Sequence, residues 1–175
     1  MIREPARSAG RVRPRERIEK LADERNIVLM YHALSAADAD AGPEMSTPGA
    51  TADPVYTVAC EDFSRHMDMV EGSGLSVRLP GETKGNGDGV IITFDDGYES
   101  DYSLALPVLL ERGLKAVFFV TAGWTGRPGY MDAGMIRALS ASGMAIGSHG
   151  LTHSYLTDLD ASRLSGELDS SRKRL

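Results

Sequence analysis

Short apolar runs alternate with amphipathic segments over the second half of this chain. Strands are predicted at 90–94, 116–120 and 144–148. Helices are predicted at 98–112, 132–142 and 160–175. Alternation of this kind implies parallel strands joined by crossover helices, so the predicted fold class is α/β.

The predicted helices carry their own boundary signals. Asp132 is a favoured N-cap residue, and Gly113 and Gly143 suit the ends of the first two helices. Pro107 falls inside 98–112 and should kink that helix or mark a fresh start. The last helix has apolar residues at Leu164, Leu168 and Leu175.

The first half is less regular. Residues 27–31 form an apolar run that predicts a buried strand ending at His32. Residues 62–71 predict a helix whose apolar face includes His66, which we expect to be a core histidine. Small, polar and glycine-rich sequence predicts a long loop at 35–54 and a turn at 81–89. We expect a basic tail over 1–26 and one domain over 27–175.

Composition excludes several classes of protein. A net charge of −6 argues against a general nucleic-acid binder. A single cysteine excludes an internal disulfide and a zinc site built from several cysteines. No apolar run approaches the roughly 18 residues of a membrane span, and the arginine-rich start lacks the apolar segment of a secretory signal. We therefore expect no membrane span and, by default, a cytoplasmic location.

Two adjacent carboxylates, Asp95 and Asp96, directly follow the strand at 90–94. Burying such a pair is costly unless a cation compensates it. In α/β folds the chemistry lies at the carboxyl ends of the strands. The strand ends of this chain carry His32, the two aspartates and His149.

The segment after the third strand contains two histidines four residues apart, His149 and His153. On one helical turn, such a pair shares a face and can converge on one ion. Two imidazoles and a carboxylate form a common divalent-metal site with positions left open for water and substrate. The metal needs only one of the two aspartates, and the other would lie beside the metal-bound water, where it can accept its proton. Alternatively, one aspartate is only the N-cap of the following helix.

This combination resembles the polysaccharide deacetylases, the NodB-homology or carbohydrate esterase family 4 enzymes. The resemblance rests on Thr93–Gly97 and on Ser148-His149 with His153 about fifty residues later. The segments 28–32, 106–109 and 116–120 also look like parts of that family, so the likeness runs from about Ile27 to the end. It implies a distorted (β/α) barrel of parallel strands, of which this chain supplies a part.

The resemblance also implies residue roles. Asp95 would be the general base, and Asp96, His149 and His153 would bind a metal, usually zinc and sometimes cobalt or manganese. The implied reaction is the hydrolytic removal of acetyl groups from N-acetylated polysaccharide, a carbon–nitrogen, non-peptide bond hydrolysis in carbohydrate metabolism. Whether His32 takes part is left open.

The later motifs of that family, which supply a groove wall, an acetyl pocket and a general acid, do not occur before Leu175. We therefore expect a C-terminally truncated product with core motifs at 88–175. Three readings follow: an active deacetylase, a catalytically impaired module that binds metal or glycan, and an iron oxygenase, whose sites also use two histidines and a carboxylate.

Overall fold

The computed structural model describes residues 26–36, 52–82 and 88–175. Its main sheet has the strand order β1-β5-β6-β7, with β4 beside the start of β5, and every pairing is parallel. The strands are β1 (Asn26–Tyr31), β4 (Ser76–Val77), β5 (Gly89–Asp96), β6 (Val117–Val120) and β7 (Ala145–Ser148). Two short strands, β2 (Ala33–Ser35) and β3 (Thr57–Ala59), form a separate parallel pair.

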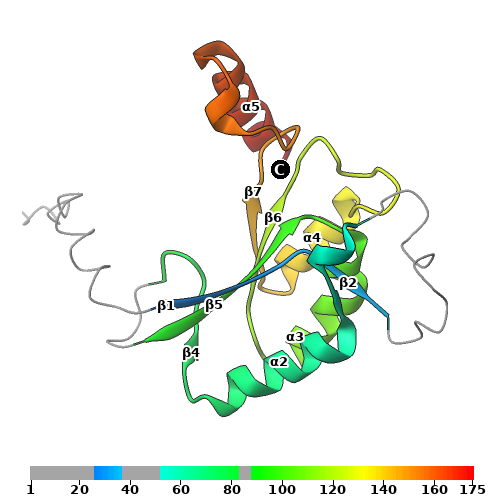
Figure 1. Ribbon diagram of the computed structural model, residues 1–175, viewed down its shortest axis with the longest axis vertical. Coiled ribbons are helices and arrows are strands. Elements are labelled where there is room, and N and C mark those ends of the chain that lie inside the picture. Colours follow the sequence, from blue (N-terminus) through cyan, green and yellow to red (C-terminus); the bar gives the residue numbers. More distant parts are fainter. Residues whose placement is uncertain (1–25, 37–51, 83–87) are drawn as a thin grey trace, which may run out of the picture.

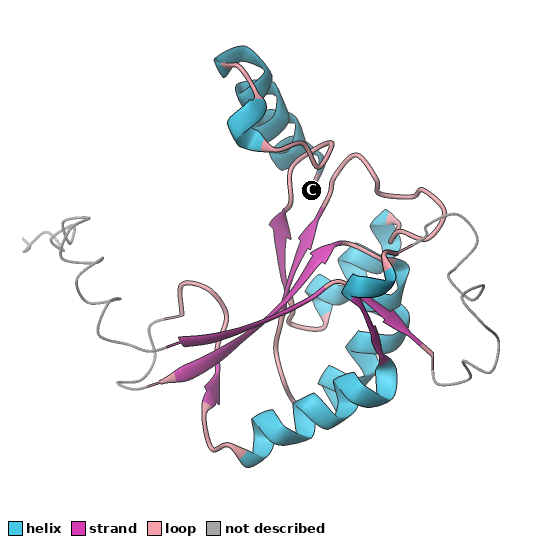
Figure 2. Ribbon diagram, viewed as in Figure 1, coloured by secondary structure: helices cyan, strands magenta, loops and turns pink. Residues whose placement is uncertain are grey.

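Helices connect the parallel strands, as the α/β prediction requires. The longer ones are α2 (Cys60–Gly72), α3 (Leu106–Glu111), α4 (Ala133–Ala141) and α5 (Ala161–Arg174). Short 3-10 turns cover Pro54–Tyr56 and Leu156–Asp158. Figure 2 shows the strands as an open twisted fan rather than a closed barrel. Over the described residues, the predicted partial barrel is confirmed.

Pro107 marks a fresh start, which is one of the two outcomes that its position predicts. A π-helical turn at Asp101–Ala105 runs directly into α3, and Pro107 lies in the first turn of α3. Proline has no N–H to donate, and in the first turn of an α-helix no backbone N–H needs an acceptor within the helix. Asp132 caps α4 as predicted, since its side chain accepts a hydrogen bond from the Met135 N–H at 2.8 Å.

The core lies between the sheet and the layer formed by α2, α3 and α4 (Figure 1). The rings of Phe94 on β5 and Phe118 on β6 stack with their centroids 4.8 Å apart, and both side chains are fully buried. Tyr31 and Phe63 pack around Phe94 at 5.4 and 5.5 Å. This aromatic group therefore ties β1, β5, β6 and α2 together directly beneath the strand ends.

Replacing Phe118 by alanine is expected to lower the free energy of unfolding by about 3–5 kcal/mol, because it leaves a cavity in the aromatic group. Urea denaturation followed by circular dichroism measures the change. Leu110→Ala is the matched control, because Leu110 is 49% exposed and its truncation should change stability little. Equal losses in the two variants would contradict this description of the core.

Two predictions for the first half are wrong in detail. The strand at 27–31 exists, but it is not buried, since Val28 and Met30 are 57% and 59% exposed at an edge of the sheet. The helix at 62–71 exists, but His66 is exposed rather than in the core. Its ring nitrogen Nδ1 instead lies 3.1 Å from the Tyr31 hydroxyl.

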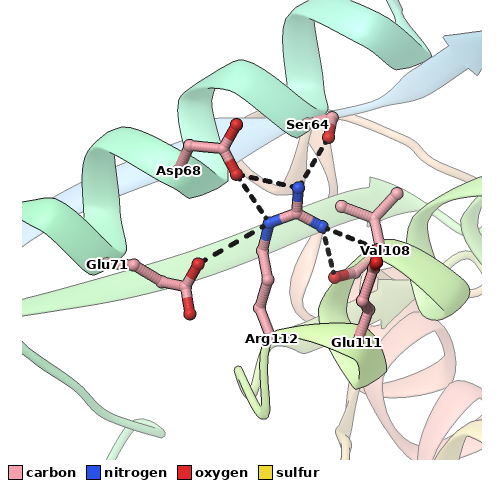
Figure 3. Close-up of polar contacts among 6 residues, drawn as sticks. All are labelled: Ser64, Asp68, Glu71, Val108, Glu111 and Arg112. Atoms are coloured by element: carbon pink, nitrogen blue, oxygen red, sulfur yellow. Dashed lines mark hydrogen bonds and ion pairs between the residues drawn. The ribbon is translucent and has the colours of Figure 1, made fainter.

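A single arginine fastens α2 to α3. Figure 3 shows the Arg112 guanidinium between the two helices, where it makes two hydrogen bonds of 2.8 and 2.9 Å to one oxygen of Asp68. Its other partners are Ser64, Glu71, Glu111 and the Val108 carbonyl. This fixes the helical layer that supports β5.

The predicted tail at 1–26 lies outside the described residues except for Asn26, which begins β1. Most of the loop at 35–54 and the centre of the turn at 81–89 also lie outside them. Among the helices of the described ranges, none combines the length and the apolar character that crossing a bilayer requires.

Candidate functional site

The two aspartates lie at the carboxyl end of β5, which extends through both of them. Their side chains can serve one site because the strand breaks at Asp96 itself, where φ is 74°, and at Gly97, where φ is 87°. A positive φ is uncommon for aspartate and ends the alternation of side chains that a strand imposes.

His149 and His153 converge on Asp96. Their Nε2 atoms lie 3.5 and 3.1 Å from the same Asp96 oxygen, Oδ1. The two histidines do not lie on a helical turn as predicted, because residues 149–155 form a loop after β7. Positive φ angles at Gly150 (83°) and His153 (63°) bring the two imidazoles together instead.

These three side chains have the chemistry of a metal-binding set. One ligand atom from each lies within 4.8 Å of the others. Asp96 is only 7% exposed, and its Oδ1 accepts no hydrogen bond although it faces two ring nitrogens. A buried carboxylate oxygen without a donor is costly, and a divalent cation shared with two neutral imidazoles would satisfy it. The residues present therefore fit a divalent metal.

Neither aspartate caps the following helix. The side-chain oxygens of Asp95 and Asp96 accept no hydrogen bond from a backbone N–H of residues 98–101 in the described structure. The alternative reading of one aspartate as an N-cap residue is therefore not supported by the geometry.

Asp95 is half-buried beside the three converging side chains. Burial raises the pKa of its carboxyl, while His149 and His32 act in the opposite direction. The structure thus brings His32, at the end of β1, into the electrostatic surroundings of Asp95. The ring of His32 also lies 4.9 Å from that of Tyr56.

A third acid, which the sequence did not single out, lies behind this pair. Asp101 in the π-helical turn is fully buried, and its carboxyl lies near the Tyr98 backbone N–H, but neither oxygen makes a hydrogen bond of normal geometry among the described residues. Burial raises the pKa of this carboxyl well above its usual range, and the charges of Asp96 and Asp95 add to the effect. The sequence gives no signal for Asp101, because it looks like an ordinary polar residue near a helix start.

An aromatic group flanks the histidines. The indole of Trp124 stacks on the His153 ring at 5.1 Å, and Tyr130 lies 4.9 Å from Trp124. Tyr98, just after the aspartates, stacks on Tyr130 at 5.1 Å. The sequence reasoning missed these residues, although Trp124 follows the end of β6 and the strand-end rule could have found it.

Comparisons with known proteins agree on one family. The profile described as polysaccharide deacetylase matches residues 82–175, which is more than half of the chain. YxkH of Bacillus subtilis, whose name places it among the polysaccharide deacetylases, is 27% identical over 154 residues, covering 83% of this chain and 50% of YxkH. The peptidoglycan-N-acetylmuramic acid deacetylase PdaA of the same organism is 34% identical over 82 residues, covering 46% of this chain and 30% of PdaA.

Solved structures share the fold. The Streptococcus pyogenes deacetylase PplD superimposes with a TM-score of 0.68 at 22% identity, over 83% of this chain and 65% of PplD. BC0361 of Bacillus cereus, a polysaccharide deacetylase, gives a TM-score of 0.68 at 21% identity, over 86% of this chain and 46% of BC0361. The chain thus spans half or less of the length of these curated relatives and about two thirds or less of these structures. From the family profile together with the shared fold, we conclude that this chain belongs to the polysaccharide deacetylase family.

Proposed function

We propose that this chain is a metal-dependent hydrolase that removes acetyl groups from N-acetylated polysaccharide. Asp96, His149 and His153 would hold a divalent cation, zinc by preference and cobalt or manganese as alternatives, and Asp95 would be the general base. The observation that carries the proposal is the convergence of two Nε2 atoms on one unpartnered, buried carboxylate oxygen at the rim of a parallel sheet. The domain responsible would comprise residues 27–175.

The metal ligands and Asp95 would have separate roles in amide hydrolysis. A divalent cation held here would acidify a water molecule and stabilise negative charge on the acetyl carbonyl oxygen. Asp95 would take the proton of the attacking water, a role that is supported by its half-buried carboxylate and by the electrostatic influence of His149 and His153 on it. Water then adds across the C–N bond, so that the products are acetate and a free amine that keeps the transferred proton.

The aromatic group suits a sugar substrate. Trp124 presents half-buried apolar surface directly beside His153, and the half-buried Tyr130 extends this surface from Trp124. Binding sites of this type combine apolar and aromatic walls with a few placed polar groups. PdaA, whose name assigns it an N-acetylated sugar of peptidoglycan, is similar to this chain over 82 residues and supports the same chemical class of substrate.

The test is acetate release from an N-acetylglucosamine oligomer, with bound metal measured in the same samples. We expect acetate from the metal-loaded chain, none after treatment with a chelator, and recovery with zinc but not with iron. Consumption of O₂ by the iron-loaded chain, without release of acetate, would favour the oxygenase reading instead. A chain that binds zinc but releases no acetate would be the binding module, and a chain whose activity survives the chelator would refute the metal.

A further inference from the structure

Helix α5 buries polar side chains rather than its leucines. Along this helix, Glu167 and Ser171 are buried, at 7% and 1% exposure, while Leu168 and Leu175 are 47% and 42% exposed. The helix projects beyond the ends of β6 and β7, away from the layer that covers the sheet (Figure 1). What α5 contacts with its buried face is therefore not the hydrophobic core.

Its partner is the loop that carries the two histidines. Glu167 Oε1 accepts hydrogen bonds from the backbone N–H groups of Leu151, at 2.7 Å, and Thr152, at 2.5 Å. The Thr152 hydroxyl donates to the same carboxylate at 3.0–3.1 Å. Leu151 and Thr152 are two of the three residues that separate His149 from His153, so one carboxylate holds the centre of this segment.

The opposite side of the loop is held by the chain that follows β6. The N–H groups of Ala122 and Gly123 donate to the carbonyls of Gly150 and Leu151 at 2.9 and 2.8 Å. A Cβ atom added to Gly123 would lie 2.2 Å from the Leu151 carbonyl oxygen, so this approach requires glycine. Glu167 thus binds the N–H groups of Leu151 and Thr152, whereas the chain after β6 binds the carbonyls of Gly150 and Leu151. The two contacts hold the centre of the loop from two directions.

The loop needs such support because its conformation is costly. His153 has φ of 63°, a region that non-glycine residues rarely occupy, and such strain persists only where surrounding contacts impose it. Gly150 has φ of 83°, and a Cβ there would approach Glu167 Oε1 at 3.0 Å. Without Glu167, the backbone N–H groups of Leu151 and Thr152 would lose their acceptor, and the loop could relax away from this shape.

We propose that Glu167 is a positioning residue for the metal centre: its carboxylate fixes the loop at Leu151 and Thr152 and thereby sets the two imidazoles on Asp96. The inference rests on the metal site of the proposed function. The inference adds α5 to that site, because the Glu167 carboxylate on this helix anchors the loop that carries the histidines. Ser171 supports it from the next turn, because its hydroxyl lies 2.9 Å from that of Ser148, the residue before His149.

A carboxylate suits this task better than other acceptors. Its hydrogen bonds with N–H and O–H donors are charge-assisted and stronger than those of a neutral amide. Burial by itself raises the pKa of Glu167, but the hydrogen bonds from Thr152 and Leu151 outweigh it, so that this pKa lies below its usual value. The anchor is therefore ionised at neutral pH.

The experiment compares Glu167→Ala and Glu167→Asp with the matched control Asp169→Ala in the full chain. The aspartate variant keeps the charge but shortens the reach by one methylene group. The control removes an exposed carboxylate of the same helix, which, within the part of the chain that the structure describes, accepts a hydrogen bond from Ser165 alone. Two quantities are measured: the Kd for Co²⁺ with its visible absorption spectrum, and hydrogen exchange of the loop amides in the metal-free protein.

We expect Kd to rise by about 10- to 100-fold in both Glu167 variants, the usual effect of losing a residue that orients metal ligands. The Co²⁺ spectrum should change, and the Leu151 and Thr152 amides should exchange faster, while Asp169→Ala matches the wild type. An unchanged Kd and spectrum with lost amide protection would overturn the proposal, because Glu167 would then only dock α5. If Glu167→Ala fails to fold, Glu167→Asp carries the comparison.

Measurements on the wild-type protein distinguish the proposal for Glu167 from the proposed metal site on which it rests. Rapid exchange of Leu151 and Thr152 in the wild type would refute the anchor without any variant. Wild-type protein that binds no Co²⁺ would instead refute the metal centre itself, whatever the loop amides do.

Discussion

Asp95→Asn is expected to retain the metal and lose deacetylation by about 10²- to 10⁴-fold, the contribution of a positioned proton acceptor. Asparagine has nearly the same shape as aspartate but cannot take a proton from water. Asp95 lies outside the set of three converging ligand atoms, so its loss should leave the Kd for Co²⁺ within about twofold of the wild type. Acetate release and Co²⁺ titration on the same preparation measure the two effects.

The control for this prediction is His32→Gln. His32 lies in the electrostatic surroundings of Asp95 but outside the converging set, and its substitution tests whether any nearby polar change abolishes turnover. We expect a smaller loss from His32→Gln than from Asp95→Asn. Undiminished turnover in Asp95→Asn would show that another group takes the proton and that the assignment of the base is wrong.

The layered fold was predictable from the sequence because its signals are local. Each strand of the second half ends at a glycine or at polar residues, and each helix has a cap or a stop, as Asp132 shows for α4. Burial was harder to predict. The strand at 27–31 reads as buried from its composition, yet its position at an edge of the sheet exposes Val28 and Met30, and position in a sheet is a property of the whole fold.

The candidate site was predictable as a set of residues but not as a geometry. The strand-end rule selects Asp95, Asp96, His149 and His32, because the carboxyl ends of parallel strands meet at one rim. It cannot show that Asp96 adopts a positive φ or that the histidine segment is a loop. The HxxxH spacing suggested a helical turn, whereas the loop reaches the same convergence through contacts with β6 and α5.

Helix α5 shows why the rest could not be predicted. Its sequence pattern draws attention to Leu164, Leu168 and Leu175, yet the buried residues are Glu167 and Ser171. Periodicity identifies the face of a helix that packs on an apolar core, whereas the buried face of α5 packs on backbone N–H groups. A buried acid that serves a neighbouring loop looks, in sequence, like any solvated charge on a helix, as does the buried Asp101 of the π-helical turn.

Asp96→Ala is expected to abolish metal binding at micromolar concentrations of ion. Structural zinc sites with four ligands bind with about 10–16 kcal/mol, so one ligand contributes roughly 2.5–4 kcal/mol and its loss weakens binding by about 10²- to 10³-fold. Asp96 should lie at the upper end, because it is the one anionic ligand and its Oδ1 is the point on which both Nε2 atoms converge. Isothermal titration with zinc measures the change.

The same substitution has two opposing effects on the stability of the metal-free fold. Asp96 Oδ1 is buried without a hydrogen bond, so alanine removes an unsatisfied charged group at the end of β5. Alanine tolerates the φ of 74° at this position less well than aspartate does, which offsets that gain. We therefore expect zinc to raise the urea midpoint of the wild type and to leave that of Asp96→Ala unchanged. His149→Ala should repeat the loss of metal. If zinc still raised the stability of Asp96→Ala, the ion would bind elsewhere, and the unpartnered carboxylate would need another explanation.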